Sequence, residues 1–335
     1  MYQFVLMVVF CGLCLGQVET TQISSYETDE ELMAQAAWLD ERAGFSSSGD
    51  QVNLKRSEGS DVETDNLRCG FESEEDALRH LAISQQVEWE LDFEHFQQDQ
   101  PYLKQTKPNY IYVVWHNIRF VSGHAMLGHL SNSQIANQIS VVNQAIGPFN
   151  FRLVLTQINR YTTTTVWDVG PHSAAINQFR KNHYVSNGNN LTMLNIYSLD
   201  LHGYAGWGHY PWLDEMGDDR RYDGILVDYQ TLPGGADPHY NQGKTLTHEW
   251  GHWLGLKHPF DAGGRCVDSD GISDTYIQSR PTSGCPFRPT DSCPDFFGYD
   301  NSHNYMDYSD DPCLTQFTSG QVSMMYFWWN WRLAN

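Results

Sequence analysis

The distribution of hydrophobic and polar residues from residue 110 onward predicts alternating strands and helices. Residues 110–115 are apolar and rich in β-forming residues, which predicts a strand over 110–120, whereas residues 131–146 carry apolar side chains at helical spacing behind Ser131, a candidate N-cap. Three more strands are predicted at 151–157, 191–197 and 225–229, and a second helix at 173–184. Because strands alternate with helices, we expect an α/β layer.

The two ends of the chain have different patterns. Two helical patterns, at 28–42 and 73–96, flank a Ser-, Gly- and Asp-rich stretch at 46–65 that we interpret as flexible. After residue 258 the chain is rich in Gly, Pro, Asp and Cys, which indicates a loop-dominated subdomain. The pattern at 319–332 predicts a helix that closes this subdomain.

The segment 248–258 reads HEWGHWLGLKH and matches the pattern HExxHxxGxxH. On a helix, His248 and His252 lie one above the other and can bind one zinc ion (Zn²⁺). Gly255 can take the backbone torsion that ends the helix, so that the chain turns and supplies His258 as third ligand. Glu249 is placed to act on a water at the fourth, open position. The pattern therefore predicts a catalytic zinc site.

Histidines that only line a helix surface are the alternative interpretation of this segment. The third histidine, at the right distance and with a glycine before it, argues against that alternative. The large apolar residues between the ligands are expected to pack in the core rather than to touch substrate.

A second motif, NYMDY at 304–308, contains Met306, which lies 48 residues (306 − 258) after the third histidine. A methionine in a loop is usually a packing residue. After an extended zinc motif, however, it is the candidate for a Met-turn, in which the methionine side chain forms an apolar floor beneath the ligands.

These motifs and further segments resemble the pappalysin family of secreted metzincins, most of all its small branch with bacterial ulilysin and the fungal extracellular metalloproteases. The segments that carry the resemblance are GKTLT at 243–247, GCP at 284–286, NYMDYSDDPC at 304–313 and FTSGQVSMM at 317–325. The resemblance spans residues 105–330. It implies an α/β (α+β) zincin fold: a twisted mixed sheet, an active-site helix and a loop-rich C-terminal subdomain with the Met-turn. It also implies an antiparallel edge strand, expected at 206–212, beside which a substrate adds a strand of its own.

The resemblance also implies roles for two residues after the methionine. Tyr308 matches the position whose phenol hydrogen-bonds the tetrahedral intermediate, although a tyrosine packed in the core is the alternative. Asp311 corresponds to an acidic residue of the primary side-chain pocket, which would favour Arg or Lys just after the scissile bond. Asp310 is adjacent, and either carboxylate is open to the alternatives of solvation or cation binding.

Calcium (Ca²⁺) is a further expectation from the resemblance. Asp270 and Thr275 match family calcium positions and supply hard oxygen ligands. The sequence departs from the family pattern at Ser269, where Gly is usual, and at Tyr276, where Pro is usual, so calcium stays open. Asn190 begins a glycosylation sequon.

The N-terminal part has the features of a signal peptide and a propeptide. We assign 1–16 as a signal peptide because the apolar stretch 4–15 is short for a membrane span; a membrane anchor is the alternative. Residues 17–99 hold 21 acidic and 5 basic side chains, a net −16 of the total −21. We therefore assign 17–105 as an acidic propeptide, with an acidic linker as the alternative, and 106–335 as the catalytic domain. Nucleic-acid and membrane partners are not expected, because basic clusters and long apolar segments are lacking.

The cysteine count adds a candidate switch. After removal of 1–16, an odd number of cysteines is left, four of them in the C-terminal part, with three possible pairings. The resemblance favours the pairs Cys266–Cys293 and Cys285–Cys313. The remaining Cys69 lies in the acidic segment, where its thiolate can bind the zinc of the latent form; an unpaired or intermolecular cysteine is the alternative.

The sequence thus predicts a secreted zinc metalloendopeptidase, made as a zymogen with its own propeptide as inhibitor and with protein or peptide substrates. A catalytically silent, secreted binding or inhibitory protein on the same scaffold is the alternative. All three zinc ligands and Glu249 are present, which favours the enzyme.

Overall fold

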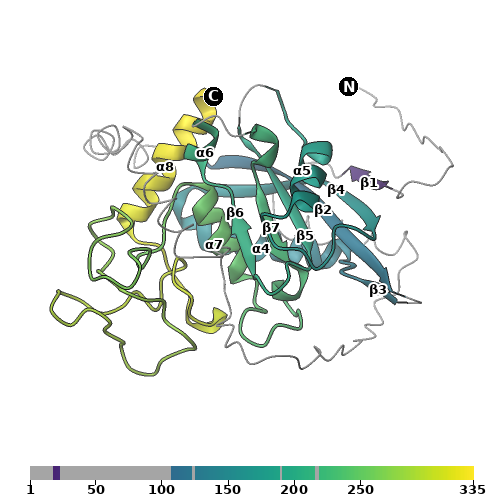
Figure 1. Ribbon diagram of the computed structural model, residues 1–335. Coiled ribbons are helices and arrows are strands. Elements are labelled where there is room, and N and C mark those ends of the chain that lie inside the picture. Colours follow the sequence, from purple (N-terminus) through teal and green to yellow (C-terminus); the bar gives the residue numbers. More distant parts are fainter. Residues whose placement is uncertain (1–17, 23–106, 123–124, 189–190, 216–218) are drawn as a thin grey trace.

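A mixed sheet forms the centre of the molecule. The computed structural model describes residues 18–22 and 107–335, except 123–124, 189–190 and 216–218. The sheet order is β1-β4-β2-β5-β7-β6, with β3 beside β2 (Figure 1). The strands are β1 (Val18–Gln22), β2 (Asn109–Ser122), β3 (Ala125–Leu127), β4 (Phe151–Thr163), β5 (Met193–Leu199), β6 (Gly206–Gly208) and β7 (Ile225–Asp228).

The four inner strands, β4, β2, β5 and β7, run parallel, and β6 pairs antiparallel with β7 at one end of the sheet. This confirms the mixed α/β sheet. The antiparallel edge strand ends at Gly208 and is therefore shorter than the expected range 206–212. Helix α6 (Pro211–Glu215) begins three residues later with a proline, which has no N–H to donate to a neighbouring strand. At the other end β1, which the sequence pattern did not predict, pairs antiparallel with β4.

The helices predicted at 131–146, 173–184 and 319–332 form, and each begins one residue after its cap. Helix α4 (Asn132–Ile146) is preceded by Ser131, whose hydroxyl accepts a hydrogen bond from the N–H of Gln134 in a capping box. Helix α8 (Ser319–Ala334) has the same arrangement between Thr318 and Gln321. The other helices of the described residues are α5 (Ala174–His183), α7 (Lys244–Trp253) and the short 3-10 helices η2 (Gly147–Phe149), η3 (Arg220–Tyr222), η4 (Tyr229–Thr231) and η5 (Asp311–Cys313).

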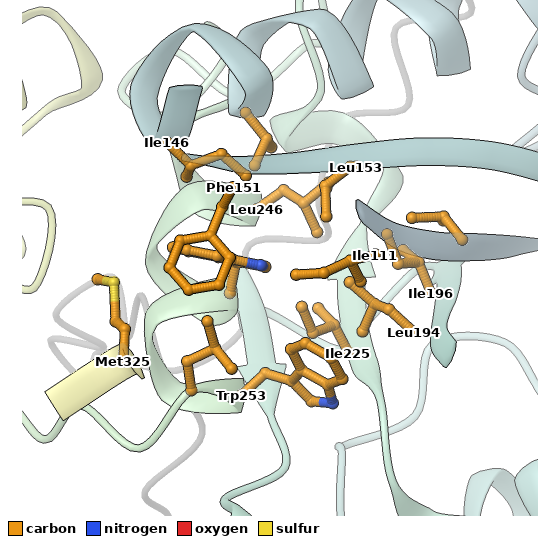
Figure 2. Packing of buried hydrophobic residues seen from close by; sticks show 14 of the residues in the cluster. Ile111, Ile146, Phe151, Leu153, Leu194, Ile196, Ile225, Leu246, Trp253 and Met325 are labelled. Carbon is orange, nitrogen blue, oxygen red and sulfur yellow. The ribbon is translucent and has the colours of Figure 1, made fainter. Parts of the chain in front are cut away.

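Both faces of the parallel strands are buried. One face packs with α4, α7 and α8 in the larger core cluster, which Figure 2 shows around Ile111, Leu194 and Trp253. The other face packs with α5 through a second cluster that contains Tyr197 and Leu226. Neighbouring residues such as Leu226 and Ile225 therefore belong to different clusters, as expected from the two-residue period of a strand buried on both sides.

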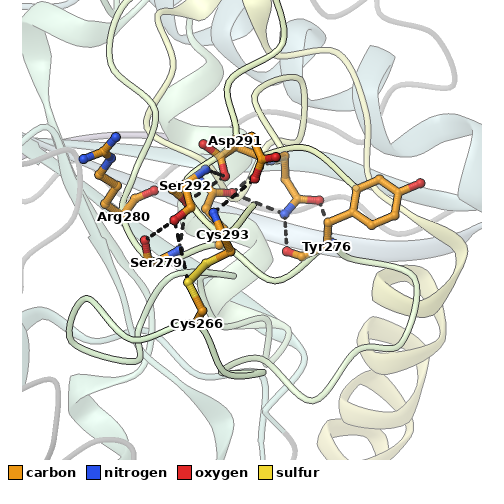
Figure 3. Close-up of a disulfide and its surroundings, with 10 residues drawn as sticks. Cys266, Tyr276, Ser279, Arg280, Asp291, Ser292 and Cys293 are labelled. Carbon is orange, nitrogen blue, oxygen red and sulfur yellow. Dashed lines mark hydrogen bonds between the residues drawn. A yellow bond between two sulfur atoms is a disulfide. The ribbon is translucent and has the colours of Figure 1, made fainter. Parts of the chain in front are cut away.

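The segment between α7 and α8 is dominated by turns and loops, as predicted, and lies at the lower left of Figure 1. Two disulfides close loops in it, Cys266–Cys293 and Cys285–Cys313, with Cα–Cα distances of 5.6 and 5.7 Å. These are the pairs that the family resemblance implies. Figure 3 shows hydrogen bonds around the first of them, where the N–H of Ser279 donates to Oγ of Ser292 at 3.0 Å.

In the part of the chain that the structure describes, no helix is both long and apolar enough to cross a membrane. The signal peptide at 1–16, the helical patterns at 28–42 and 73–96, the stretch 46–65 and Cys69 lie outside the described residues.

Candidate active site

Helix α7 and the turn after it position the three histidines. The N–H of Gly255 donates to the carbonyl of His252 and the N–H of Leu256 to that of Gly251, both at 2.9 Å, which is a Schellman motif. Gly255 has a φ of 80°, and a Cβ on it would overlap the indole of Trp328. Glycine is therefore needed at this position for two reasons: the left-handed backbone conformation and the lack of space for a Cβ. The turn directs the chain back toward α7, so that His258 lies beside the other two histidines.

The Nε2 atoms of His248, His252 and His258 converge on one point. The three pairwise distances are 3.1, 3.1 and 3.0 Å, and all three side chains are fully buried. Within the described ranges, this is the one group of His, Cys or acidic side chains whose ligand atoms gather closely enough to hold a metal ion. In a tetrahedral zinc site with Zn–N bonds of about 2.0–2.1 Å, ligand nitrogens are about 3.3 Å apart, so the spacing fits.

The opposite ring nitrogens show which tautomer the histidines adopt. Nδ1 of His248 lies 2.6 Å from the carbonyl oxygen of Tyr305, and Nδ1 of His252 lies 2.6 Å from that of Leu256. Nδ1 of His258 lies 2.8 Å from Oδ1 of Asp261. Each of these oxygens accepts, so each Nδ1 carries the proton and each Nε2 presents a lone pair. Three lone pairs that face one another about 3 Å apart repel unless a cation lies between them.

Asp261 is a site residue that sequence reasoning missed. Its carboxylate also accepts the backbone N–H of His258 at 3.0 Å, and its own N–H donates to Oγ of Ser269 at 3.1 Å. The available signal is the position of an acidic residue three places after the third histidine. Ser269 donates to the carbonyl of His258 at 3.2 Å, so the serine that departs from the family pattern supports this turn.

Glu249 is fully buried, between α7 and the edge strand β6, and its carboxylate lies against Gly206. Met306 lies on the other side of α7. It is fully buried, and a Cβ on Gly251 would lie 2.5 Å from its sulfur. Glu249 thus belongs to the helix that carries the first two histidines, and Met306 packs against that helix.

Tyr308 lies beside the histidine rings. Its ring centroid is 5.1 Å from that of His258 and 5.8 Å from that of His248, and it stacks edge-on against Phe260 at 4.9 Å. The side chain is partly exposed. The structure therefore brings together the residues predicted from the two motifs: the three histidines, Glu249, Met306 and Tyr308.

Asp311 contacts the start of α7. It is 1% exposed, and its Oδ2 accepts the backbone N–H groups of Gln242 and Lys244 at 2.8 and 3.2 Å. This carboxylate therefore stabilises the positive end of the active-site helix. Asp310 is more exposed and accepts a hydrogen bond from Nδ1 of His239 at 3.0 Å, which raises the pKa of that histidine.

The predicted calcium loop brings Asp270 and Thr275 together. The Thr275 hydroxyl lies 3.0 and 2.9 Å from the two carboxylate oxygens of Asp270, and burial raises the pKa of that carboxyl to about 7. Asp274 points elsewhere, because its Oδ2 accepts hydrogen bonds from Ser319 and Gly320 at the start of α8.

A mixed sheet with an antiparallel edge strand, followed by a helix and turn that gather three histidines around a metal position, defines a metalloprotease of the metzincin class. Comparison with known proteins agrees. The family model described as "Pregnancy-associated plasma protein-A" matches residues 189–328. An extracellular metalloprotease of Neurospora crassa is 41% identical over 211 residues, which cover 62% of this chain and 70% of the relative. One from Arthroderma otae is 40% identical over 205 residues, covering 60% of this chain and 72% of the relative.

Two solved structures from Tannerella forsythia are similar. A promirolysin mutant matches with a TM-score of 0.58 and 26% identity, over 77% of this chain and 92% of that one. Mature mirolysin in complex with a cleaved peptide matches with a TM-score of 0.54 and 30% identity, over 66% and 91%. The chain belongs to the pappalysin family of metzincin metalloendopeptidases.

Proposed function

We propose that this protein is a secreted zinc metalloendopeptidase that cleaves protein or peptide substrates. The observation that carries the proposal is the convergence of three buried Nε2 lone pairs, each fixed by an acceptor at Nδ1, with a buried glutamate on the helix that carries the first two histidines. The relatives named as extracellular metalloproteases support the location. His248, His252 and His258 would hold the metal.

The proposed reaction depends on the metal ion and on three side chains, those of Glu249, Tyr308 and Met306. A bound zinc ion lowers the pKa of water to about 7 and polarises a carbonyl. Glu249 accepts the proton of the attacking water and returns it to the departing amine, so one carboxylate serves both halves of the reaction. Tyr308, from its position beside the rings of His248 and His258, donates its phenol proton in a hydrogen bond to the developing oxyanion. The side chain of Met306 packs against Gly251 of α7 and forms an apolar floor beneath this helix.

The substrate is proposed to bind in extended form along β6. This strand is the last in the sheet order and pairs with β7 on one side, so it offers an edge to which a further strand can add. Glu249 lies directly under this edge. Mature mirolysin has been solved with a cleaved peptide, which supports a peptide as ligand here.

A preference for Arg or Lys after the scissile bond is a finer proposal. It rests on Asp311, which stands at the position that the family resemblance assigns to the primary side-chain pocket. Paired peptides that differ only in Arg or Leu at that position test it. Equal kcat/KM for both peptides would remove the proposal and leave the general protease function intact.

Synthesis as a zymogen is proposed from the acidic segment 17–105 and from Cys69. The match to promirolysin covers a larger share of this chain than the match to mature mirolysin, 77% against 66%, which supports a segment in front of the catalytic domain. The thiolate of Cys69 would bind the metal and exclude water. A Cys69→Ser variant should become active without proteolytic removal of the segment, and continued latency would exclude the cysteine as the switch.

Calcium at Asp270 and Thr275 is a separate proposal that rests on the hard oxygen atoms of this pair. Added calcium should raise the melting temperature of the wild type and not that of an Asp270→Asn variant. An equal effect of calcium on both proteins would place the ion elsewhere.

Cleavage of casein, with and without a zinc chelator, tests the main proposal. Wild-type protein should lose activity with the chelator and regain it with stoichiometric zinc. The Glu249→Gln variant should bind one zinc ion and stay inactive. Chelator-insensitive cleavage, or full activity of the variant, would contradict the mechanism.

A further inference from the structure

Strand β6 has one face without side chains. It reads Gly206-Trp207-Gly208, and because side chains alternate across a strand, the two glycines share one face and Trp207 occupies the other. Trp207 is 8% exposed, belongs to the second core cluster and lies 4.9 Å from the guanidinium of Arg180. The glycine face is turned toward α7.

The space at Gly206 is filled by the side chain of Glu249. A Cβ on Gly206 would lie 2.6 Å from Cγ and from Oε1 of Glu249 and 2.8 Å from its Cδ, closer than real Cβ contacts come. The backbone of Gly206 is not among the positive-φ positions, so an alanine would be conformationally acceptable there. The glycine is therefore required for space alone, and the atoms that would have to move are the Cγ and carboxylate atoms of one side chain, Glu249.

The space at Gly208 is filled by the helix itself. A Cβ on Gly208 would overlap the carbonyl oxygen of Glu249 and lie 2.9 Å from Cβ of His252. Backbone and Cβ atoms cannot move away as a side-chain end can, so the helix would have to shift. The two glycines thus allow the edge strand to contact α7 at two successive points, the side chain and the backbone of the same glutamate.

We propose that Gly206 is a positioning residue for the reaction. Because Gly206 has no side chain, the backbone of β6 lies directly against the Glu249 carboxylate and fixes its position. That position is below the edge strand beside which the substrate is proposed to bind. Gly208 sets the separation of strand and helix at the same place. This inference rests on the proposed function, since it assigns the position of the glutamate that the function uses.

The test compares Gly206→Ala with Gly147→Ala, because Gly147 has helical torsions and open space around its would-be Cβ. Gly206→Ala should lower kcat about 100-fold, the scale of a displacement of roughly 1 Å in a catalytic group. KM, zinc stoichiometry and melting temperature should change little, since the fold can accommodate the methyl group by moving one side chain. Gly147→Ala should be indistinguishable from wild type.

A double-mutant cycle with Glu249→Ala separates positioning from general damage. Alanine lacks the Cγ, Cδ and Oε1 atoms that the methyl group would meet, so adding Gly206→Ala to Glu249→Ala should change the residual kcat by less than about 3-fold. If Gly206 acted on the fold rather than on the glutamate, the two losses would multiply. That result would overturn the proposal, and so would a wild-type kcat for Gly206→Ala.

A crystal structure of the metal-free Gly206→Ala protein gives a readout that does not depend on activity. The Glu249 carboxylate should be displaced from its wild-type position while α7 and β6 stay in place. An unmoved carboxylate would contradict the inference. Wild-type protein without any zinc-dependent cleavage would instead contradict the proposed function, and the displaced carboxylate would still show how glycine sets its position.

Discussion

The carboxylate of Asp261 holds His258 at two points. Its Oδ1 accepts the proton of Nδ1 at 2.8 Å and its Oδ2 accepts the backbone N–H at 3.0 Å. Among the three histidines, His258 is the one oriented by a charged group, because His248 and His252 donate to backbone carbonyls. The ligand outside the helix is thus oriented by a side chain, whereas backbone carbonyls orient the two helical ligands.

Replacement of Asp261 by Asn should therefore weaken metal binding. An amide retains a single acceptor oxygen and removes the charge that makes the imidazole a stronger ligand, and such outer partners typically contribute 10–100-fold in affinity. We expect a loss of about this size in zinc affinity, measured by competition with a chromogenic chelator. Asp295→Asn, at an exposed position, is the matched control. Equal affinities in the two variants would show that Asp261 does not tune the metal.

Tyr308→Phe should reduce catalysis and leave metal binding unchanged. Loss of one donor to an oxyanion typically costs about 2.7–4 kcal/mol, or roughly 10²–10³-fold in kcat. The ring would keep its packing on Phe260 and His258, so zinc stoichiometry and melting temperature should stay at wild-type values. Tyr276→Phe is the control, because that tyrosine is 43% exposed. A wild-type kcat in the Tyr308→Phe enzyme would show that this tyrosine only packs against its neighbours and does not take part in catalysis.

Local sequence signals predicted the helices well and the strand lengths less well. Ser131 was predicted as an N-cap and is one, since a cap depends only on residues within one turn. Strand β4 was predicted to end at residue 157 and continues to Thr163, because it pairs in parallel with β2 up to Phe120. That pairing joins residues that are more than forty positions apart in the sequence, so a local sequence pattern cannot predict it.

The same difference between local signals and distant contacts holds at the candidate active site. The spacing of His248, His252 and His258 is a property of one helix and one turn, so it could be predicted from eleven consecutive residues. The oxygen that orients His248 comes from Tyr305, which is 57 residues away. The contact of Asp311 with the start of α7 likewise depends on how two distant segments pack, and alignment of motifs did not indicate it.

Asp228 should make the protein less stable as the pH rises. It is 5% exposed, and burial raises its pKa to about 7, partly offset by hydrogen bonds from the N–H groups of Gln230 and Leu201. The unfolded carboxyl titrates near pH 3.9. Between about pH 4 and pH 7 the folded protein therefore binds a proton that the unfolded chain has released, and the stabilisation is lost through this window.

An Asp228→Asn variant tests this sign, because the amide keeps an acceptor for the N–H groups and cannot ionise. The free energy of unfolding in urea should depend less steeply on pH in the variant than in the wild type between about pH 4 and pH 7. Each unit of pKa difference corresponds to about 1.4 kcal/mol. Parallel pH curves for the two proteins would show that this carboxyl titrates normally.

The last prediction concerns the buried ion pair between Arg332 of the C-terminal helix and Asp223, both of which hydrogen-bond to Trp253 at the end of the active-site helix. Two nitrogens of Arg332 lie 3.0 and 3.1 Å from the carboxylate oxygens of Asp223, and Nη2 also donates to the carbonyl of Trp253 at 3.0 Å. The indole N–H of Trp253 donates to Asp223 at 2.9 Å, and both charged side chains are fully buried.

Arg332→Met would leave the carboxylate buried without its partner, which typically costs about 3–5 kcal/mol. The urea midpoint should fall accordingly, whereas Arg221→Met, which breaks an exposed pair with Asp219, should cost at most about 1 kcal/mol. Adding Asp223→Asn to Arg332→Met removes the isolated charge and should restore part of the stability. A double variant no more stable than Arg332→Met would mean that the arginine acts through its packing on Trp253, 3.9 Å from the ring, rather than through the charge.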